Sequence, residues 1–234
     1  DKSDKKLQKG ITKYDGYFTF YYDENSDKIF LQVDKIEDEF LYVRSLSEGV
    51  GSNDIGLDRG QLGRGVVVYF KKAGNKILLV QPNQKYRAIT DNDEERNSVR
   101  EAFAKSVLHG FIIRETHKNK YLIDATSFLM RDAHGVASRL ARSNEGKYNL
   151  DKSRSAIHLK RTKAFPKNVE FDVMLTFTGT PKGYNIRSVT PDASAVTVNQ
   201  HHSFVKLPDN NYKPRKYDPR SGSWQMSYMD YSTP

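Results

Sequence analysis

The segment GVVVYFKKAGNKILLVQP, residues 65–82, contains two short apolar runs, residues 66–70 and 77–80, on either side of a polar turn with a glycine. Both runs are rich in β-branched and aromatic residues, which predicts an antiparallel hairpin. The same pattern recurs at residues 17–33 and 110–124, and in each copy a lysine opens the second run. These lysines, Lys28, Lys76 and Lys120, lie 48 and then 44 residues apart, within the range of internal repeats. The chain is therefore predicted to be rich in β-hairpins.

Other segments extend this pattern along the chain. Residues 39–46 (EFLYVRSL) add a third apolar run after the first hairpin, and a further strand is expected within residues 193–207. Residues 169–178 alternate between apolar and polar side chains, as in a strand with one buried face. Its odd-numbered residues are expected to face the core, and the solvent-facing set is expected to be Glu170, Asp172, Thr176 and Thr178. Residues 179–183 (GTPKG) are expected to form a turn.

Two segments change to a helical period. Residues 91–108 place Val99, Ala102, Phe103 and Val107 on one face; Thr90 or Asp93 is expected to cap the start, and Gly110 to end the helix. Residues 126–143 also have an apolar helical face, but Gly135 lies in the middle, so two short helices are an alternative. The predicted class is α+β, mostly antiparallel hairpins in a meander with helices at these two places. The helices argue against a β-propeller, which the repeat length alone would suit.

The same patterns divide the chain into three parts. Residues 1–13 are charged and polar and are expected to form a flexible end. Residues 14–207 are expected to form a single β-rich α+β domain, and residues 208–234, rich in Pro, Tyr and Arg, an extended arm leading to a further domain. Within the domain, residues 47–65 form a long glycine-rich loop.

Composition limits the function. The absence of cysteine among 234 residues excludes a disulfide scaffold, a zinc ribbon and thiol catalysis. No apolar run approaches the roughly 20 residues that span a bilayer. The formal net charge is +9, and residues 147–167 hold seven basic residues against Asp151 alone. This stretch is either an ordinary solvated surface or a contact surface for an anionic ligand.

The histidines and aspartates offer few metal ligands. No two histidines have the i,i+4 spacing of a zinc-protease helix. His201 and His202 are adjacent, so on a strand they point to opposite faces and cannot both bind one metal without a kink. His202 is in step with core-facing residues and is expected in the core or at an interface. Asp54 and Asp58, in the glycine-rich loop, are candidate calcium ligands, but their spacing does not match that of a calcium-binding loop. The favoured interpretation is that Asp54, Asp58 and Arg59 form local bonds within the loop.

Asp132 and His134 place a carboxylate two residues from an imidazole. A hydrolase triad would also need a serine, and the serines are too numerous to single one out. Asp132 is therefore expected to act as a helix cap or ion-pair partner, with an independent hydrolase as a third hypothesis.

The arm interleaves aromatic and basic residues around the single tryptophan, Trp224. Such a pattern can bind single-stranded nucleic acid, and it equally suits an arm that packs on a neighbouring domain. The candidate interaction residues of the whole chain are Asp58, Arg59, Asp132, His134, Lys160, Arg161, Tyr212, Arg215, Tyr217, Arg220 and Trp224.

Six stretches together resemble one known family. They are LVQPNQKYRA (79–88), GVGSNDIGLDRGQLG (49–63), LIDATSFLMRDAHGVA (122–137), RTKAFPKN (161–168), RSVTPDASAVTVNQHHSFVKLPD (187–209) and YKPRKYDPRSGSW (212–224). In this order and combination they are similar to the amino-terminal region, a domain of unknown function, of large secreted bacterial zinc-dependent metalloproteases. The resemblance covers the chain from about residue 14 to its end.

The resemblance implies that the catalytic zinc site lies in a different domain from this chain. The zinc-binding His-Glu-x-x-His helix of that family lies in a later domain, so no catalytic residue, metal site or cofactor is expected in this chain, and zinc is expected downstream. The expected partner is that downstream metalloprotease domain of the same protein. Export is also implied, to a periplasmic, cell-surface or extracellular location. The expected function is a non-catalytic module that docks on or masks the catalytic domain. The alternative is a basic module that binds a glycan, an envelope surface or, less in line with the pattern, nucleic acid.

Overall fold

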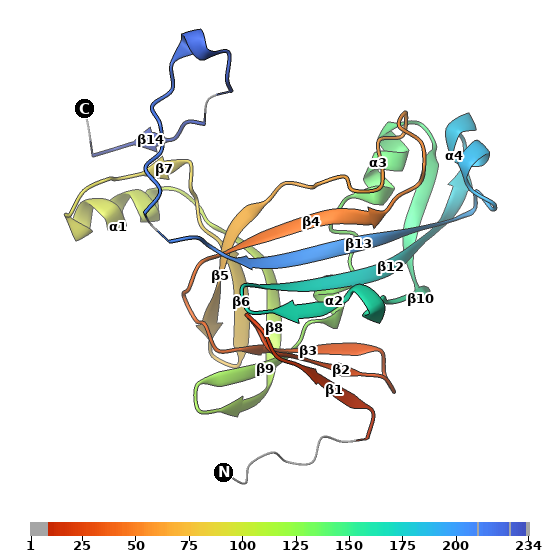
Figure 1. Cartoon of the computed structure of the whole chain (residues 1–234), viewed down its shortest axis with the longest axis horizontal. Helices are drawn as coiled ribbons and strands as arrows, with labels where there is room; N and C mark the ends of the chain where they lie inside the picture. The colour runs from red at the N-terminus through yellow and green to blue at the C-terminus, as the bar shows by residue number, and fades with distance from the viewer. Residues whose placement is uncertain (1–8, 210, 225, 233–234) are drawn as a thin grey trace.

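The structure, a computed structural model, describes residues 9–209, 211–224 and 226–232. A twelve-stranded sheet, in which all strand pairs run antiparallel, dominates it (Figure 1). In sheet order, its strands are β1 (Ile11–Tyr14), β2 (Phe20–Asp23), β3 (Lys28–Val33), β9 (Lys120–Asp124), β8 (Ser106–His117), β6 (Lys76–Gln81), β5 (Val66–Ala73), β4 (Phe40–Glu48), β13 (Ala195–Lys206), β12 (Asn168–Pro181) and β10 (Gly146–Ile157), with β11 (Lys163–Phe165) also paired to β12. A second sheet pairs β7 (Tyr86–Arg87) with β14 (Met229–Asp230) in parallel.

The large sheet curls so that its two ends approach each other. Figure 1 shows β1, β2, β3 and β9 below β4, β13 and β12, with β5, β6 and β8 connecting the two layers at one side. The amide of Tyr17 donates to the carbonyl of Phe165 at 2.7 Å, and the amide of Ile157 donates to the Asp27 carboxylate at 3.1 Å. These contacts join the segment before β2 and the β2–β3 turn to the β10–β11 region, which closes the sheet around its interior.

Aromatic side chains fill that interior. Phe18 is fully buried, and its ring centroid lies 5.2 Å from that of Phe40, 5.6 Å from Phe70 and 6.2 Å from Phe204, each in an edge-to-face arrangement. Such pairs add about 0.5–1.5 kcal/mol each to the burial of their apolar area. Because these rings come from four separate segments, their contacts hold the two layers of the curled sheet together.

All three predicted hairpins are present, as β2–β3, β5–β6 and β8–β9. The β5–β6 turn is shorter than predicted, because the strands extend to Ala73 and from Lys76, and Gly74 between them has a φ of +56°. In the β8–β9 turn, Lys118 and Asn119 both have positive φ, as a two-residue type I′ turn requires. The hairpins join one sheet instead of forming propeller blades.

The helix predicted for residues 91–108 is wrong in its second half. Helix α1 spans Asp93–Ala102, and its cap is Asn92, whose side chain accepts from the Glu94 amide. The chain is already extended at Phe103 and then enters β8, so Gly110 lies inside a strand. The apolar residues after position 105 pair with β6, and this pairing prevails over the helical period of the sequence.

The other helical segment forms two short helices, the alternative that Gly135 allows. They are α2 (Thr126–Leu129) and α3 (Val136–Arg142), and Gly135 precedes α3 with a φ of +80°. The remaining helices are α4 (Tyr184–Val189) and the 3₁₀ turns η1 (Leu159–Arg161) and η2 (Pro219–Ser221). The fold is mostly β, as the hairpin pattern predicts, and its helices are too short to justify more than a loose α+β label. None of the described helices is long and apolar enough to cross a membrane.

The burial pattern of β12 differs from the one predicted for residues 169–178. Its odd-numbered residues from Val169 to Phe177 are buried as predicted, but Asp172 and Thr176 on the other face are buried too. The chain that follows β10 folds over this face, and the Asp172 amide donates to the Thr162 hydroxyl at 3.1 Å. The expected turn at residues 179–183 is also displaced, because β12 continues to Pro181 and pairs there with β10.

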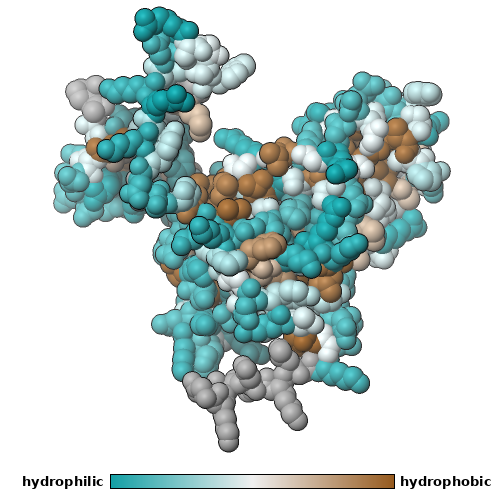
Figure 2. Space-filling view, viewed as in Figure 1, coloured by the Kyte–Doolittle hydropathy of each residue, from teal (hydrophilic) through white to brown (hydrophobic). Residues whose placement is uncertain are grey.

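A small lobe projects from the sheet and is formed by α1, β7 and β14 (Figure 1). Tyr86 stacks on Phe103 with a centroid distance of 3.8 Å, and Tyr231 lies 5.4 Å from Phe103. Between Lys206 and Met229 the described residues leave the sheet and return to this lobe. We call this segment the projecting loop, and its surface is largely hydrophilic in Figure 2.

Replacing Phe18 with Ala removes the ring that contacts Phe40, Phe70 and Phe204. We expect a loss of about 3–5 kcal/mol in the free energy of unfolding, measured by urea denaturation. Ile112→Ala in β8, where the side chain is 52% exposed, is the control and should change stability by less than about 0.5 kcal/mol. Equal effects of the two substitutions would contradict the assignment of Phe18 to the core.

Candidate functional site

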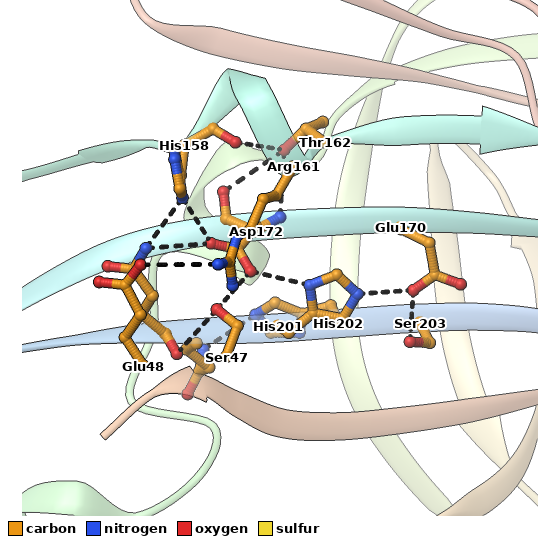
Figure 3. Close-up of polar contacts among 12 residues, drawn as sticks. Ser47, Glu48, His158, Arg161, Thr162, Glu170, Asp172, His201, His202 and Ser203 are labelled. Atoms are coloured by element: carbon orange, nitrogen blue, oxygen red, sulfur yellow. Dashed lines mark hydrogen bonds and ion pairs between the residues drawn. The ribbon is translucent and has the colours of Figure 1, made fainter. Parts of the chain in front are cut away.

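A cluster of polar and charged side chains lies on the outer face of β12, β13 and β4 (Figure 3). In the β12–β13 register Asp172 lies opposite His201, and Glu170 lies opposite Ser203. Alternation along each strand places these four side chains on one face, and Ser47 of β4 joins them.

His201 lies between two carboxylates, as Figure 3 shows. Its Nδ1 is 2.8 Å from Asp172 Oδ2, and its Nε2 is 2.7 Å from Glu170 Oε2. Burial by itself would lower the pKa of His201, but the hydrogen bonds to Asp172 and Glu170 raise that pKa to about 9. At neutral pH the ring is therefore an imidazolium that donates from both nitrogens.

Asp172 has further partners that hold it ionised. Its side chain is fully buried; it accepts from the Ser47 hydroxyl at 2.5 Å, and its Oδ1 lies 3.0 Å from His158 Nδ1. Burial would raise the pKa of Asp172, and the hydrogen bonds from His201, Ser47 and His158 lower it below its usual value. The Asn199 amide nitrogen is 2.8 Å from the same His158 Nδ1 and 3.3 Å from Asp172 Oδ1.

Glu170 is held in a similar way at the other side of His201. It accepts from Ser203 and Asn168, and its side chain is only 16% exposed. Burial would raise the pKa of Glu170, and these hydrogen bonds together with His201 lower it. At the rim, the Arg161 guanidinium lies 3.9 Å from the Glu48 carboxylate.

Hydrogen bonds within the cluster occupy both ring nitrogens of His201. An imidazolium that donates a hydrogen bond from each nitrogen has no lone pair with which to accept a proton or bind a metal. No group of three or more His, Asp or Glu within the described residues could hold a metal ion. Two surface cavities, one lined by Val50 and Thr190 and the other by Tyr69 and Phe103, include no residue of the cluster. Its chemistry is that of a buried charge network that fixes three strands together.

His202 faces the opposite side of β13, as the alternation predicts. It is fully buried; Nδ1 accepts from the Tyr42 hydroxyl at 2.9 Å, and Nε2 donates to the Leu129 carbonyl at 3.0 Å. Burial lowers the pKa of His202 to about 3, so the ring is neutral. Both nitrogens are thus used in linking β13 to β4 and to the end of α2.

Asp132 caps a helix. Its carboxylate accepts from the backbone amides of Gly135, Val136 and Ala137 at 2.8–3.0 Å, which are the first amides of α3. His134 turns elsewhere: its Nε2 lies 3.1 Å from the Gln61 side chain, and burial lowers its pKa. The hydrogen bonds of Asp132 and His134 therefore go to different partners.

The glycine-rich loop does not follow the expectation of local bonds from Asp58 and Arg59. Asp54 and Arg59 are exposed and Asp58 is half-buried, and none of these three side chains has a hydrogen-bond or ion-pair partner within the described part of the chain. The loop is instead held by Ile55, which is buried and whose carbonyl accepts from Arg139 Nε at 2.7 Å.

The other seven predicted interaction residues lie in two further places. Five of them, Tyr212, Arg215, Tyr217, Arg220 and Trp224, lie together on the projecting loop. Arg220 pairs with Asp218 at 2.7 Å, whereas Trp224 is 99% exposed. Lys160 and Arg161 lie in η1 beside β12, on a different part of the molecule (Figure 1).

Comparison with known protein families finds a match. A family profile matches residues 60–234, well over half of the chain. The chain belongs to the family DUF5117, a domain of unknown function. No curated protein and no solved structure matches it.

The DUF5117 match includes the projecting loop and the part of the polar cluster that lies on β12 and β13, but it starts in the loop before β5. Strand β4, upstream of the match, lies between β5 and β13 and contributes Ser47 to the cluster. In this protein, residues outside the match therefore complete the sheet. The family description does not mention a peptidase.

The cluster predicts a defined pH dependence of stability. The pKa of His201 is raised in the folded state, so its contribution is complete below about pH 6.5 and is lost as the pH rises through about 9. The pKa values of Asp172 and Glu170 are lowered, so their contribution is lost in acid. The destabilisation by His201→Gln should be on the order of 3 kcal/mol larger at pH 6 than at pH 10 in urea unfolding. The exposed His117→Gln is the control, and a destabilisation by His201→Gln that does not vary with pH would refute the ion-pair arrangement.

Asp132→Ala removes the acceptor for three amides of α3 and should cost about 1–2 kcal/mol in thermal or urea unfolding. Asp58→Ala, which breaks no such bond, should leave the stability unchanged. Peptide hydrolysis by the purified chain that is lost in the double variant Asp132→Ala/His134→Ala would show that these residues do more than cap α3.

Proposed function

We propose that this chain is a non-catalytic module that docks on, or masks, the catalytic domain of a secreted bacterial zinc metallopeptidase. The observation that carries the proposal is the projecting loop, where Trp224 and Met226 are 99% and 98% exposed. Trp and Met are among the residue types that are enriched at protein interfaces. The resemblance described above supplies the identity of the partner.

The loop is held at both ends, which favours binding. At one end it continues from β13, and at the other β14 pairs with β7. The Arg87 guanidinium lies 4.4 Å from the ring centroid of Tyr228, and the Ile89 amide donates to Asp230 at 3.1 Å. A loop fixed in this way loses less conformational freedom on binding than a free tail does.

The residues of the loop suit a protein partner with an acidic surface. Tryptophan, tyrosine and arginine dominate the energetics of protein interfaces. Tyr212 is 76% exposed and Tyr217 48%, and the cationic residues Lys213, Arg215 and Lys216 stand between and beside them. In this proposal the indole of Trp224 enters a pocket of the catalytic domain, and the cations steer the approach.

The chemistry of peptide hydrolysis belongs to the partner in this account. The proposed partner domain carries the zinc, and this chain needs neither a metal nor a catalytic base. The protonated state of His201 and the core position of His202 support a structural role for both. Export to the periplasm, the cell surface or the medium forms part of the same proposal.

The second candidate is a basic ligand-binding module for a glycan, nucleic acid or envelope surface. It is favoured by the exposure of all seven basic residues of the 147–167 stretch, along β10, η1 and β11. Its binding would fall steeply between low and moderate salt. Salt-independent binding, or none at low salt, would rule it out.

The test titrates the 234-residue chain into the separately produced catalytic domain and follows both binding and peptide hydrolysis. Saturation near one equivalent is the expected result, with inhibition if the module masks the cleft. Trp224→Ala should raise the Kd by about 30-fold or more, as the loss of an interface hot spot does.

Tyr184→Ala is the matched control, because Tyr184 is 82% exposed but lies on α4, away from the projecting loop. It should leave the Kd unchanged. Failure of the wild-type chain to bind would overturn the docking proposal, and equal effects of the two variants would overturn the role of the loop.

A further inference from the structure

A cavity of about 380 Å³ lies between the α1 lobe and β5. Three aromatic residues line it: Tyr69 of β5, Tyr86 of β7 and Phe103 at the end of α1. Its size is at the lower end of the range for small-ligand sites in proteins. None of the residues of the His201 cluster lines it.

Charged residues of opposite sign reach this cavity from different elements. Glu37 and Glu39 come from the segment that links β3 to β4. Arg100 comes from α1, and Lys105 from the short segment between α1 and β8. Acidic and basic residues therefore line the same cavity, together with the aromatic rings.

These four charged side chains and the Tyr69 hydroxyl have no hydrogen-bond or ion-pair partner in the described ranges 9–209, 211–224 and 226–232. Three of these charges, those of Glu37, Glu39 and Arg100, act on Tyr69. Burial and the charge of Glu37 raise the pKa of Tyr69, Arg100 opposes this rise, and Glu39 adds to it. Polar groups that converge on a cavity without protein partners are the usual mark of a binding site.

Two further arginines that line the cavity, unlike Arg100, have hydrogen-bond partners within the protein. Arg87 donates to the backbone carbonyl and side chain of Gln84, and Arg96 is held by Asp93 and the Thr90 carbonyl. Their hydrogen bonds within the protein fix the local backbone. The unpartnered charges are left in equal number, two negative and two positive, which argues against a simple anion or a simple cation as the ligand.

We propose that this cavity binds a short zwitterionic peptide. Its carboxylate lies towards Arg100 and Lys105, and its ammonium group lies towards Glu37 and Glu39. An apolar side chain between the two charged groups packs on the aromatic rings. Tyr86 and Phe103 line the cavity and also contact Tyr231, so the occupant lies next to the anchor of the projecting loop.

The probe is the free tripeptide alanyl-leucyl-alanine, whose ends lie about 10 Å apart when extended. Its affinity for the ¹⁵N-labelled chain is measured by NMR titration at low salt, beside the N-acetylated, C-amidated and doubly capped forms. Each charge of the free peptide is expected to contribute about three- to fivefold in affinity, as a partly exposed ion pair does. The doubly capped form should bind most weakly.

Two variants assign the charges to the walls. Arg100→Gln should weaken the free and the N-acetylated peptide about three- to fivefold and leave the C-amidated peptide unaffected. The double variant Glu37→Gln/Glu39→Gln should show the reverse selectivity. Arg142→Gln, at an exposed arginine of α3, is the matched control and should change none of the affinities.

No shift of cavity resonances at millimolar free tripeptide would overturn the proposal. Equal binding of all four forms, or affinities that neither variant changes, would do the same. The result is separable from the docking proposal, because Arg100→Gln leaves the projecting loop intact and Trp224→Ala leaves the cavity intact.

Discussion

The pairing of β12 with β13 is the constraint on which the rest of the structure depends. Eleven consecutive residue pairs, from Asn168–Val205 to Thr178–Ala195, set a single register. On one face this register places Phe171 and Phe204 in the core, and on the other it places Asp172 beside His201. A slip of one residue would exchange the faces, leaving buried charges unpaired and aromatic rings exposed. Because an unpaired buried charge costs several kcal/mol, the polar cluster specifies the register as much as the core does.

Local patterns in the sequence predict much of this fold. The period-two runs and turn residues locate the three hairpins and β4, and Gly135 marks the break between α2 and α3. The helical period of the sequence mispredicts the structure where pairing with a distant strand competes with helix formation. Residues 106–108 continue a helical pattern, but β6 offers them hydrogen-bonded partners and they become part of β8. The order of strands in the sheet, and its closure through Tyr17 and Phe165, depend on contacts that no local pattern encodes.

The candidate site is predictable only in part for the same reason. Alternation along β13 is sufficient to place His202 in the core and His201 on the other face. It does not reveal that Asp172 lies opposite His201, or that residues 158–162 cover this face, so Asp172 is mistaken for a solvent-facing residue. Composition identifies the segment after Lys206 as an arm, yet its return to β7 is a tertiary feature. The cavity beside α1 likewise unites residues from four separate segments.

The central claim is that this DUF5117 chain acts through contact, with Trp224 and Met226 at the centre of an interface. Hydroxyl-radical footprinting of the chain, with and without the proposed metallopeptidase domain, tests this claim most directly because both side chains are highly exposed. The account predicts strong protection of Trp224 and Met226 in the complex, while Tyr184 on α4 stays as reactive as in the free chain. A complex in which both loop residues remain fully reactive would contradict it.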